Sequence, residues 1–172
     1  GHPFYTQVIC TNIVDYLNGV QRNTLVIEDL DEVLRTIIEN PPPQLVYAWD
    51  ERSPAEQLAL SLLSEESTGA QAPLPAEALF EAIAKRNYPL NIKADTLHIA
   101  LESLYEHKVV DRTQEGAFWV RVDLQRQWIR RARSIWRLVE ETKPPEQARR
   151  WPWAVAAMLV VEAAGALRRP LI

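Results

Sequence analysis

The sequence predicts a mainly α-helical chain with one small β-hairpin, and three observations support this fold class. Apolar residues recur at helical spacing over long segments. Twelve prolines against five glycines suggest helices separated by proline breaks. Two β-prone runs flank a Gln-Glu-Gly turn in the second half of the chain. We expect four regions, 1–43, 44–123, 124–143 and 144–172.

Region 1–43 is expected to hold two helices. The first covers 3–18 and is stopped by Asn18-Gly19. The second begins at Thr24 or shortly after it and carries an apolar stripe from Leu30 to Ile38. Three prolines, Pro41 to Pro43, end this helix because proline cannot donate a backbone hydrogen bond. A boundary between two domains is therefore placed here.

Region 44–123 is expected to hold three main helices followed by the hairpin. A short apolar helix or connector comes first, and Ser53, Pro54 and Glu56 then form a capping box with proline at the first helical position. Two further helices follow, the second within 93–108. The hairpin spans 109–122, with Gly116 expected at positive φ. Three helices followed by a hairpin is the order of a winged-helix domain.

Region 124–143 is expected to be one long basic helix. The chain has a net charge of -4, yet residues 1–120 hold 8 basic and 18 acidic side chains, whereas 121–150 hold 9 basic and 4 acidic. Arg126, Arg130, Arg133 and Arg137 are spaced to share one helix face. This face is either a solvated stripe or a basic partner-binding face for an acidic protein surface or anionic lipid.

Region 144–172 is an apolar tail with two alternative structures. Residues 151–167 contain one charge, Glu162, and lie between Arg149-Arg150 and Arg168-Arg169. The pattern fits a segment that spans or docks on a membrane, although the run is short and Glu162 opposes insertion. The alternative is a buried C-terminal helix.

The sequence offers little that could carry catalysis. It has no Gly-rich phosphate-binding loop, no cysteine pair and no recognisable nucleophile signature. The single cysteine, Cys10, is expected to be a small buried apolar residue in a reducing compartment. His2, His98 and His107 are far apart in sequence, and no metal site is expected.

The helix within 93–108 argues against DNA as a partner. A recognition helix normally brings lysine and arginine to the phosphates. Here Asp95, Glu102 and Glu106 lie between the two lysines at the ends, Lys93 and Lys108. Its apolar positions are expected to be core: Leu97, Ala100, Leu101, Leu104 and Tyr105.

The opening "GHPFYTQVIC" resembles the Gly-x-Pro motif that begins the lid subdomain in bacterial and archaeal STAND ATPases. These AAA+-like P-loop proteins are signal-transduction ATPases with numerous domains. The resemblance extends over 1–141 and includes "FWVRVDLQRQWIRR" at the junction of hairpin and helix. It implies that Pro3 contacts a bound nucleotide and that Gly1 and His2 shape the turn. Region 1–43 would then be the helical lid subdomain of an ATPase.

The resemblance implies a regulatory role rather than catalysis by this chain. The P-loop and the acidic Mg²⁺-binding strand are absent, so no cofactor is expected in this fragment, and ATP or ADP with Mg²⁺ is expected in the full-length protein. The implied partners are an upstream P-loop domain in the same chain and an effector domain or protein. Because the only methionine is Met158, we expect a piece of a longer protein.

The expected location is cytoplasmic, with tethering to the inner face of the membrane if 151–167 docks there. The alternative functions are a winged-helix transcriptional regulator that binds DNA and a protein-interaction module.

Overall fold

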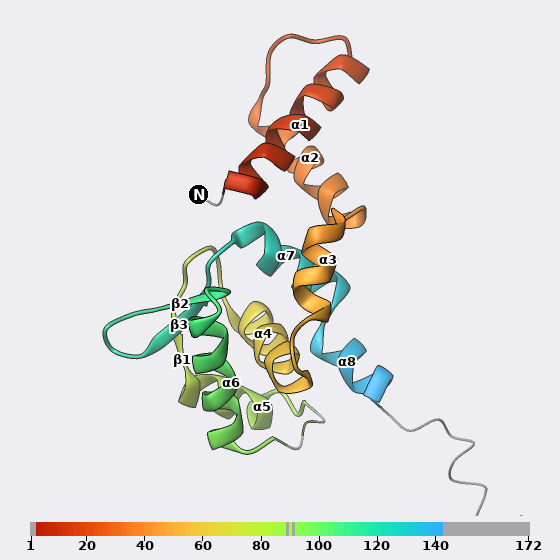
Figure 1. The fold of residues 1–172 in the computed structure, drawn as a ribbon. Helices are drawn as coiled ribbons and strands as arrows, with labels where there is room; N and C mark the ends of the chain where they lie inside the picture. Colours follow the sequence, from red (N-terminus) through yellow and green to blue (C-terminus); the bar gives the residue numbers. More distant parts are fainter. Residues whose placement is uncertain (1–2, 89, 91, 143–172) are drawn as a thin grey trace, which may run out of the picture. The chain divides into compact units, whose positions relative to one another are not determined.

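The computed structural model describes residues 3–88, 90 and 92–142, and they are mainly helical with one small antiparallel sheet (Figure 1). The expected fold class is confirmed at this level. The chain divides into two compact units, 1–139 and 140–172. The first unit contains the sheet and all the described helices except the last residues of the final helix.

Helices α1 (Pro3–Gly19) and α2 (Ile27–Glu39) pack against each other as a hairpin (Figure 1). A buried carboxylate at the start of α2 holds the connection between them. Asp29 accepts a hydrogen bond from the Val26 backbone N–H at 3.0 Å and one from the Tyr16 hydroxyl at 3.1 Å. It also forms an ion pair with Arg22. The first of these bonds satisfies a free N–H at the start of α2.

The proline run separates two helices within the first unit. Helix α2 ends at Glu39, and α3 (Pro43–Asp50) begins at the last of the three prolines. Trp49 on α3 is buried, and its ring lies edge-on to that of Trp128, 6.1 Å between centroids. This contact packs α3 against α7 (Asp123–Ala132), the helix that contains Trp128.

Helix α4 (Pro54–Glu66) begins with the capping box that the sequence predicts. The Ser53 hydroxyl accepts from the Glu56 N–H at 3.3 Å, and the Glu56 carboxylate accepts from the Ser53 N–H at 2.8 Å. Two otherwise free N–H groups at the helix start are satisfied in this way.

Helices α5 (Ala76–Lys85) and α6 (Ala94–Glu106) pack on each other, and α6 also packs on α4. The sheet consists of β1 (Leu74–Pro75), β2 (Val110–Arg112) and β3 (Ala117–Val120) in the order β1-β3-β2. Gly116 has a φ of 86°, as the predicted hairpin requires. Strand β1, in which Leu74 pairs with Phe118, was not predicted. The core includes the fully buried Leu60, Leu63, Leu97, Leu101, Leu104 and Phe118.

The prediction of one long basic helix over 124–143 is wrong. The described residues form α7 (Asp123–Ala132) and α8 (Ile135–Thr142), separated by Arg133 and Ser134. The Ser61 hydroxyl of α4 donates to the Arg133 carbonyl at 2.7 Å, so at the break this carbonyl accepts a hydrogen bond from a side chain of another helix. The break also allows Ile135, 1% exposed, to enter the core. Burial of an apolar side chain thus outweighs continuation of the helix.

Candidate functional site

The N-terminal turn that resembles a nucleotide contact is described only from Pro3 onward. Pro3 is the first residue of α1 and is exposed. Gly1 and His2, the other two predicted nucleotide-binding residues, lie outside the described residues. Proline fits this position because its fixed φ suits a helix start and it has no N–H to leave unpaired.

The exposed positions of α1 form a nearly uncharged surface. Pro3, Gln7, Cys10 and Val14 follow each other at helical spacing and are all exposed. Val14 is 54% exposed. The expectation that Cys10 is buried is wrong, since the side that α1 turns toward α2 carries other residues. We call the four side chains the free face of α1.

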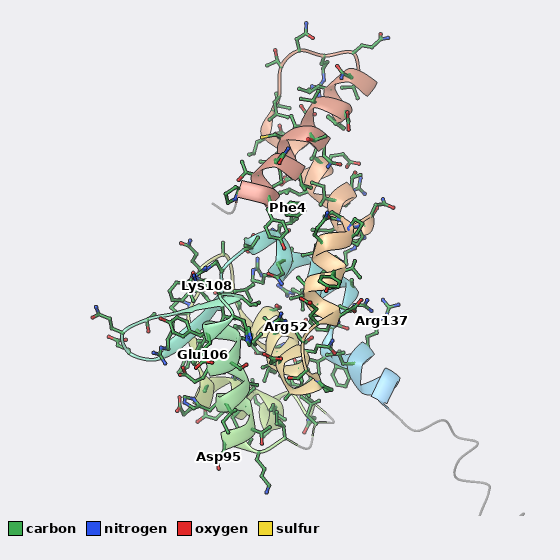
Figure 2. The ribbon with its side chains drawn as sticks, viewed as in Figure 1. Phe4, Arg52, Asp95, Glu106, Lys108 and Arg137 are labelled. Atoms are coloured by element: carbon green, nitrogen blue, oxygen red, sulfur yellow. The ribbon has the colours of Figure 1, made fainter. Side chains whose placement is uncertain are left out.

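The opposite side of α1 packs against the rest of the unit. Tyr5 and Ile9, with residues 120–124 from the end of β3 to the start of α7, line a pocket of about 290 Å³. Tyr5 is half-buried, and burial raises the pKa of its phenol. The Phe4 ring, labelled in Figure 2, lies edge-on to the ring of the adjacent Tyr5, with 5.1 Å between the ring centroids. Tyr5 and Ile9 pack against the core of the unit, so this side of α1 is covered while Pro3 at the start of the helix is exposed.

The four arginines predicted to share a basic face do not lie on one helix. Arg126 is buried in α7, and its Nε donates to Asp123 at 2.6 Å. Arg133 lies in the break, with its guanidinium over the Trp128 ring at 5.8 Å. Arg130 is exposed on α7, and Arg137 is exposed on α8 (Figure 2). A continuous arginine stripe is thus excluded by the break and by the burial of Arg126.

The outward side of α6 is acidic and apolar. Leu97, Ala100, Leu101 and Leu104 are buried, as the sequence predicts, whereas Tyr105 is 38% exposed. Figure 2 shows Asp95 at the start of α6, with Glu106 and Lys108 at the other end of the helix.

A groove of about 430 Å³ runs between this side of α6 and α5. Its lining residues are Ala76, Glu77, Phe80, Glu81, Ala94, Asp95, His98 and Ile99. We call it the α5–α6 groove. Three of these side chains are carboxylates and none is lysine or arginine.

A buried polar cluster joins the start of α4 to the end of α6. Glu56, 8% exposed, accepts hydrogen bonds from the hydroxyls of Ser53 at 2.8 Å and Ser103 at 2.9 Å. Burial acts to raise the pKa of Glu56, but the hydrogen bonds from Ser53 and Ser103 and the nearby Arg52 outweigh it and hold the pKa below its ordinary value. His107 Nδ1 lies 3.8 Å from Glu56 and 2.8 Å from the Ser103 carbonyl oxygen. Both serine hydroxyls donate to the Glu56 carboxylate, so we interpret the cluster as a structural link between α4 and α6 and call it the joint at Glu56.

The described part of the chain holds no group of three or more His, Cys, Asp or Glu side chains that could bind a metal ion. Within 3–88, 90 and 92–142, no helix combines the length and the apolar character needed to cross a bilayer. The predicted membrane segment 151–167 lies outside the described residues. Comparison of the chain with protein-family models, curated proteins and solved structures gives no match.

Sequence reasoning missed the α5–α6 groove and the joint at Glu56. The sequence did contain a signal for the groove: Phe80 and Ile99 are large apolar residues at otherwise polar positions of two predicted helices, a pattern that indicates an apolar surface patch. The contact between Glu56 and Ser103 had none, because the two residues are 47 positions apart and only the packing of α4 on α6 brings them together.

Proposed function

We propose that this chain is the lid and winged-helix portion of a STAND-like signalling ATPase. In this proposal α1 and α2 cover a nucleotide held by a P-loop domain of the same protein. The winged-helix portion that follows α2 in the chain relays the nucleotide state to an effector. The observation that carries the proposal is the free face of α1.

Helix α1 is unusual for a helix at a surface. Only one of its 17 residues, Asp15, is charged, and none of its side chains is fully buried. A helix exposed to water normally carries charged and polar side chains on its outer side. Among the exposed side chains of α1 only Asp15 is charged: the free face presents proline, glutamine, cysteine and valine, and threonine and asparagine side chains are exposed beside it. This low charge favours coverage by another protein surface. A nucleotide-binding domain that adjoins Pro3 would supply such a surface.

The order of elements from α4 to β3 supports a winged-helix module. Helix, short strand, two helices and a hairpin follow each other, and β1 pairs with β3 rather than lying free. The three helices share one core with the sheet. Helix α7 then follows the hairpin directly, as the resemblance implies.

Helix α7 gives the proposed relay a physical route. It packs against both α2 and α4, and its Arg131 pairs with Glu39 of α2 at 2.7 Å. Trp128 and Ile129 of α7 are buried in the core. A rearrangement of the lid hairpin would therefore act on α7 and, through it, on α4. Switching would then be a population shift between two arrangements of packed helices.

The DNA-binding alternative receives no support from α6. The exposed side of this helix carries Asp95 and Glu106, and carboxylates repel the phosphate backbone. The alternative of a protein-interaction module is compatible with the α5–α6 groove. The proposed relay to an effector would also need a surface that binds another protein.

The test is an ADP titration by calorimetry of the protein extended upstream to its natural start. We expect Pro3→Ala to weaken ADP binding about tenfold, or ~1.4 kcal/mol. The matched control is Pro54→Ala, which removes another exposed proline from the first position of a helix. Absence of ADP binding by the extended protein, or equal effects of the two substitutions, would contradict the proposal.

A further inference from the structure

We propose that the α5–α6 groove binds a basic amphipathic helix of a partner protein, with a bulky apolar side chain of the partner in the groove and lysine or arginine at its rim. The proposal concerns a surface separate from the free face of α1 and does not depend on nucleotide binding.

The apolar part of the groove is exposed on both of its walls. Phe80 of α5 is 39% exposed and Ile99 of α6 is 67% exposed, and both line the same hollow. Ala76 and Ala94 also line it, and their small side chains leave space there. Two helices separated by an apolar hollow can accept a third helix by its apolar side.

The charged rim selects the kind of partner. Glu77, Glu81 and Asp95 are exposed, and among the described residues none of them has a hydrogen bond or an ion pair. Some other carboxylates of the same unit are paired, namely Glu102 with Arg112, Asp111 with Arg121 and Glu66 with Arg86. Exposed carboxylates elsewhere, such as Glu28 and Asp31 of α2, have no ion pair among the described residues, so the groove differs from them in placing its carboxylates around an apolar hollow. Three unpaired carboxylates around an apolar hollow complement lysine or arginine side chains that flank an apolar anchor.

The same charges disfavour nucleic acid and an anionic bilayer. Both carry negative charge, and the groove is lined by no lysine or arginine that could offset the repulsion. A basic protein helix satisfies both the apolar and the charged parts of the surface. Attraction at the rim would speed association, while burial of Phe80 and Ile99 would supply most of the affinity.

The probe for the test is a synthetic helical peptide of leucine, lysine and alanine, with the leucines along one side and lysines beside them. Binding to the full chain is measured by fluorescence anisotropy. We expect saturable binding that weakens as salt rises, because exposed charges are screened. A peptide with glutamate in place of lysine and one with alanine in place of leucine should each bind about tenfold more weakly or not at all.

Variants of the chain locate the binding. Ile99→Ala should weaken binding about tenfold, whereas Ile27→Ala, which trims an isoleucine 68% exposed outside the groove, should leave it unchanged. Glu77→Gln combined with Glu81→Gln should reduce both the affinity and its salt dependence. The matched pair Glu28→Gln and Asp31→Asn changes exposed carboxylates of α2 and should do neither.

Four results would overturn the proposal. The first is no binding of the leucine–lysine peptide. The second is equal binding of the peptide without leucine, which would reduce the effect to a general attraction to an acidic surface. The third is equal loss of affinity in the groove variants and the α2 variants. Salt-dependent binding of a DNA duplex that competes with the peptide would also contradict it.

Discussion

The carboxylate of Glu56 performs two tasks at once. It completes the capping box at the start of α4, and it accepts a hydrogen bond from Ser103 on α6. The sequence predicts the first task from the spacing of Ser53 and Glu56, because both groups lie within one turn. The second depends on how α4 packs against α6, which local spacing does not determine.

We predict that Glu56→Gln lowers the free energy of unfolding by about 1–3 kcal/mol at neutral pH. The substitution removes the charge and replaces one oxygen that accepts from Ser53 or Ser103 by an NH2 group that cannot accept. The folded-state pKa of Glu56 lies below the ordinary value of 4.5. The ionised carboxylate therefore stabilises the fold fully above the unfolded-state pKa, and this contribution is lost as pH falls through the folded-state pKa. The difference between wild type and variant should shrink as pH falls below 4.5.

Urea unfolding at a series of pH values measures this difference. The matched control is Glu115→Gln, which changes an exposed carboxylate in the hairpin turn and should leave the free energy of unfolding nearly unchanged. A difference for Glu56→Gln that stays constant down to about pH 3 would show that the carboxylate charge does not contribute.

Among the secondary-structure elements, the break between α7 and α8 has the clearest long-range support. Ser61 on α4 donates its hydroxyl to the Arg133 carbonyl, 72 residues away in sequence. One turn along α4, Ser64 is also buried, but its hydroxyl has no hydrogen-bond partner among the described residues. Helix α4 therefore carries one buried serine, Ser61, that hydrogen-bonds to the break and another, Ser64, that does not.

We predict opposite outcomes for these two serines. Ser61→Ala leaves the Arg133 carbonyl without its partner and should lower the free energy of unfolding by about 1–3 kcal/mol. Ser64→Ala removes an unpaired buried hydroxyl and should leave the stability unchanged or raise it by about 1 kcal/mol. Thermal and urea unfolding of both variants give the comparison. Equal losses of stability would mean that the hydroxyl of Ser61 does not stabilise the break.

The sequence predicts the helices of the described region because their apolar stripes and start signals are local. The capping box at Ser53 and the positive φ of Gly116 are confirmed. The break at Arg133 was missed because arginine is a good helix former and the spacing of the arginines continues across it. Ser134 directly before Ile135 was a usable signal, since serine is a common N-cap residue. Strand β1 is two residues long, too short to show any alternation.

At the scale of the first compact unit, two surfaces differ sharply in character. The free face of α1 is almost uncharged, whereas the α5–α6 groove is rimmed by carboxylates. The sequence analysis placed Pro3 in a nucleotide contact but expected Cys10, on the same face, to be buried, and it missed the α5–α6 groove. It also predicted a basic face that does not form, because tertiary packing buries Arg126 and ends the helix at Ala132. In the proposed function the free face of α1 contacts a nucleotide-binding domain.

The most direct test of this account is hydrogen exchange of the α1 amides in the extended protein with and without ADP. Coverage of the free face by a nucleotide-bound domain should suppress local opening, so exchange of the amides of residues 4–14 should slow by about tenfold on addition of ADP. Amides of α6 serve as the internal reference and should change little. Exchange in α1 that is the same with and without ADP would contradict the lid assignment.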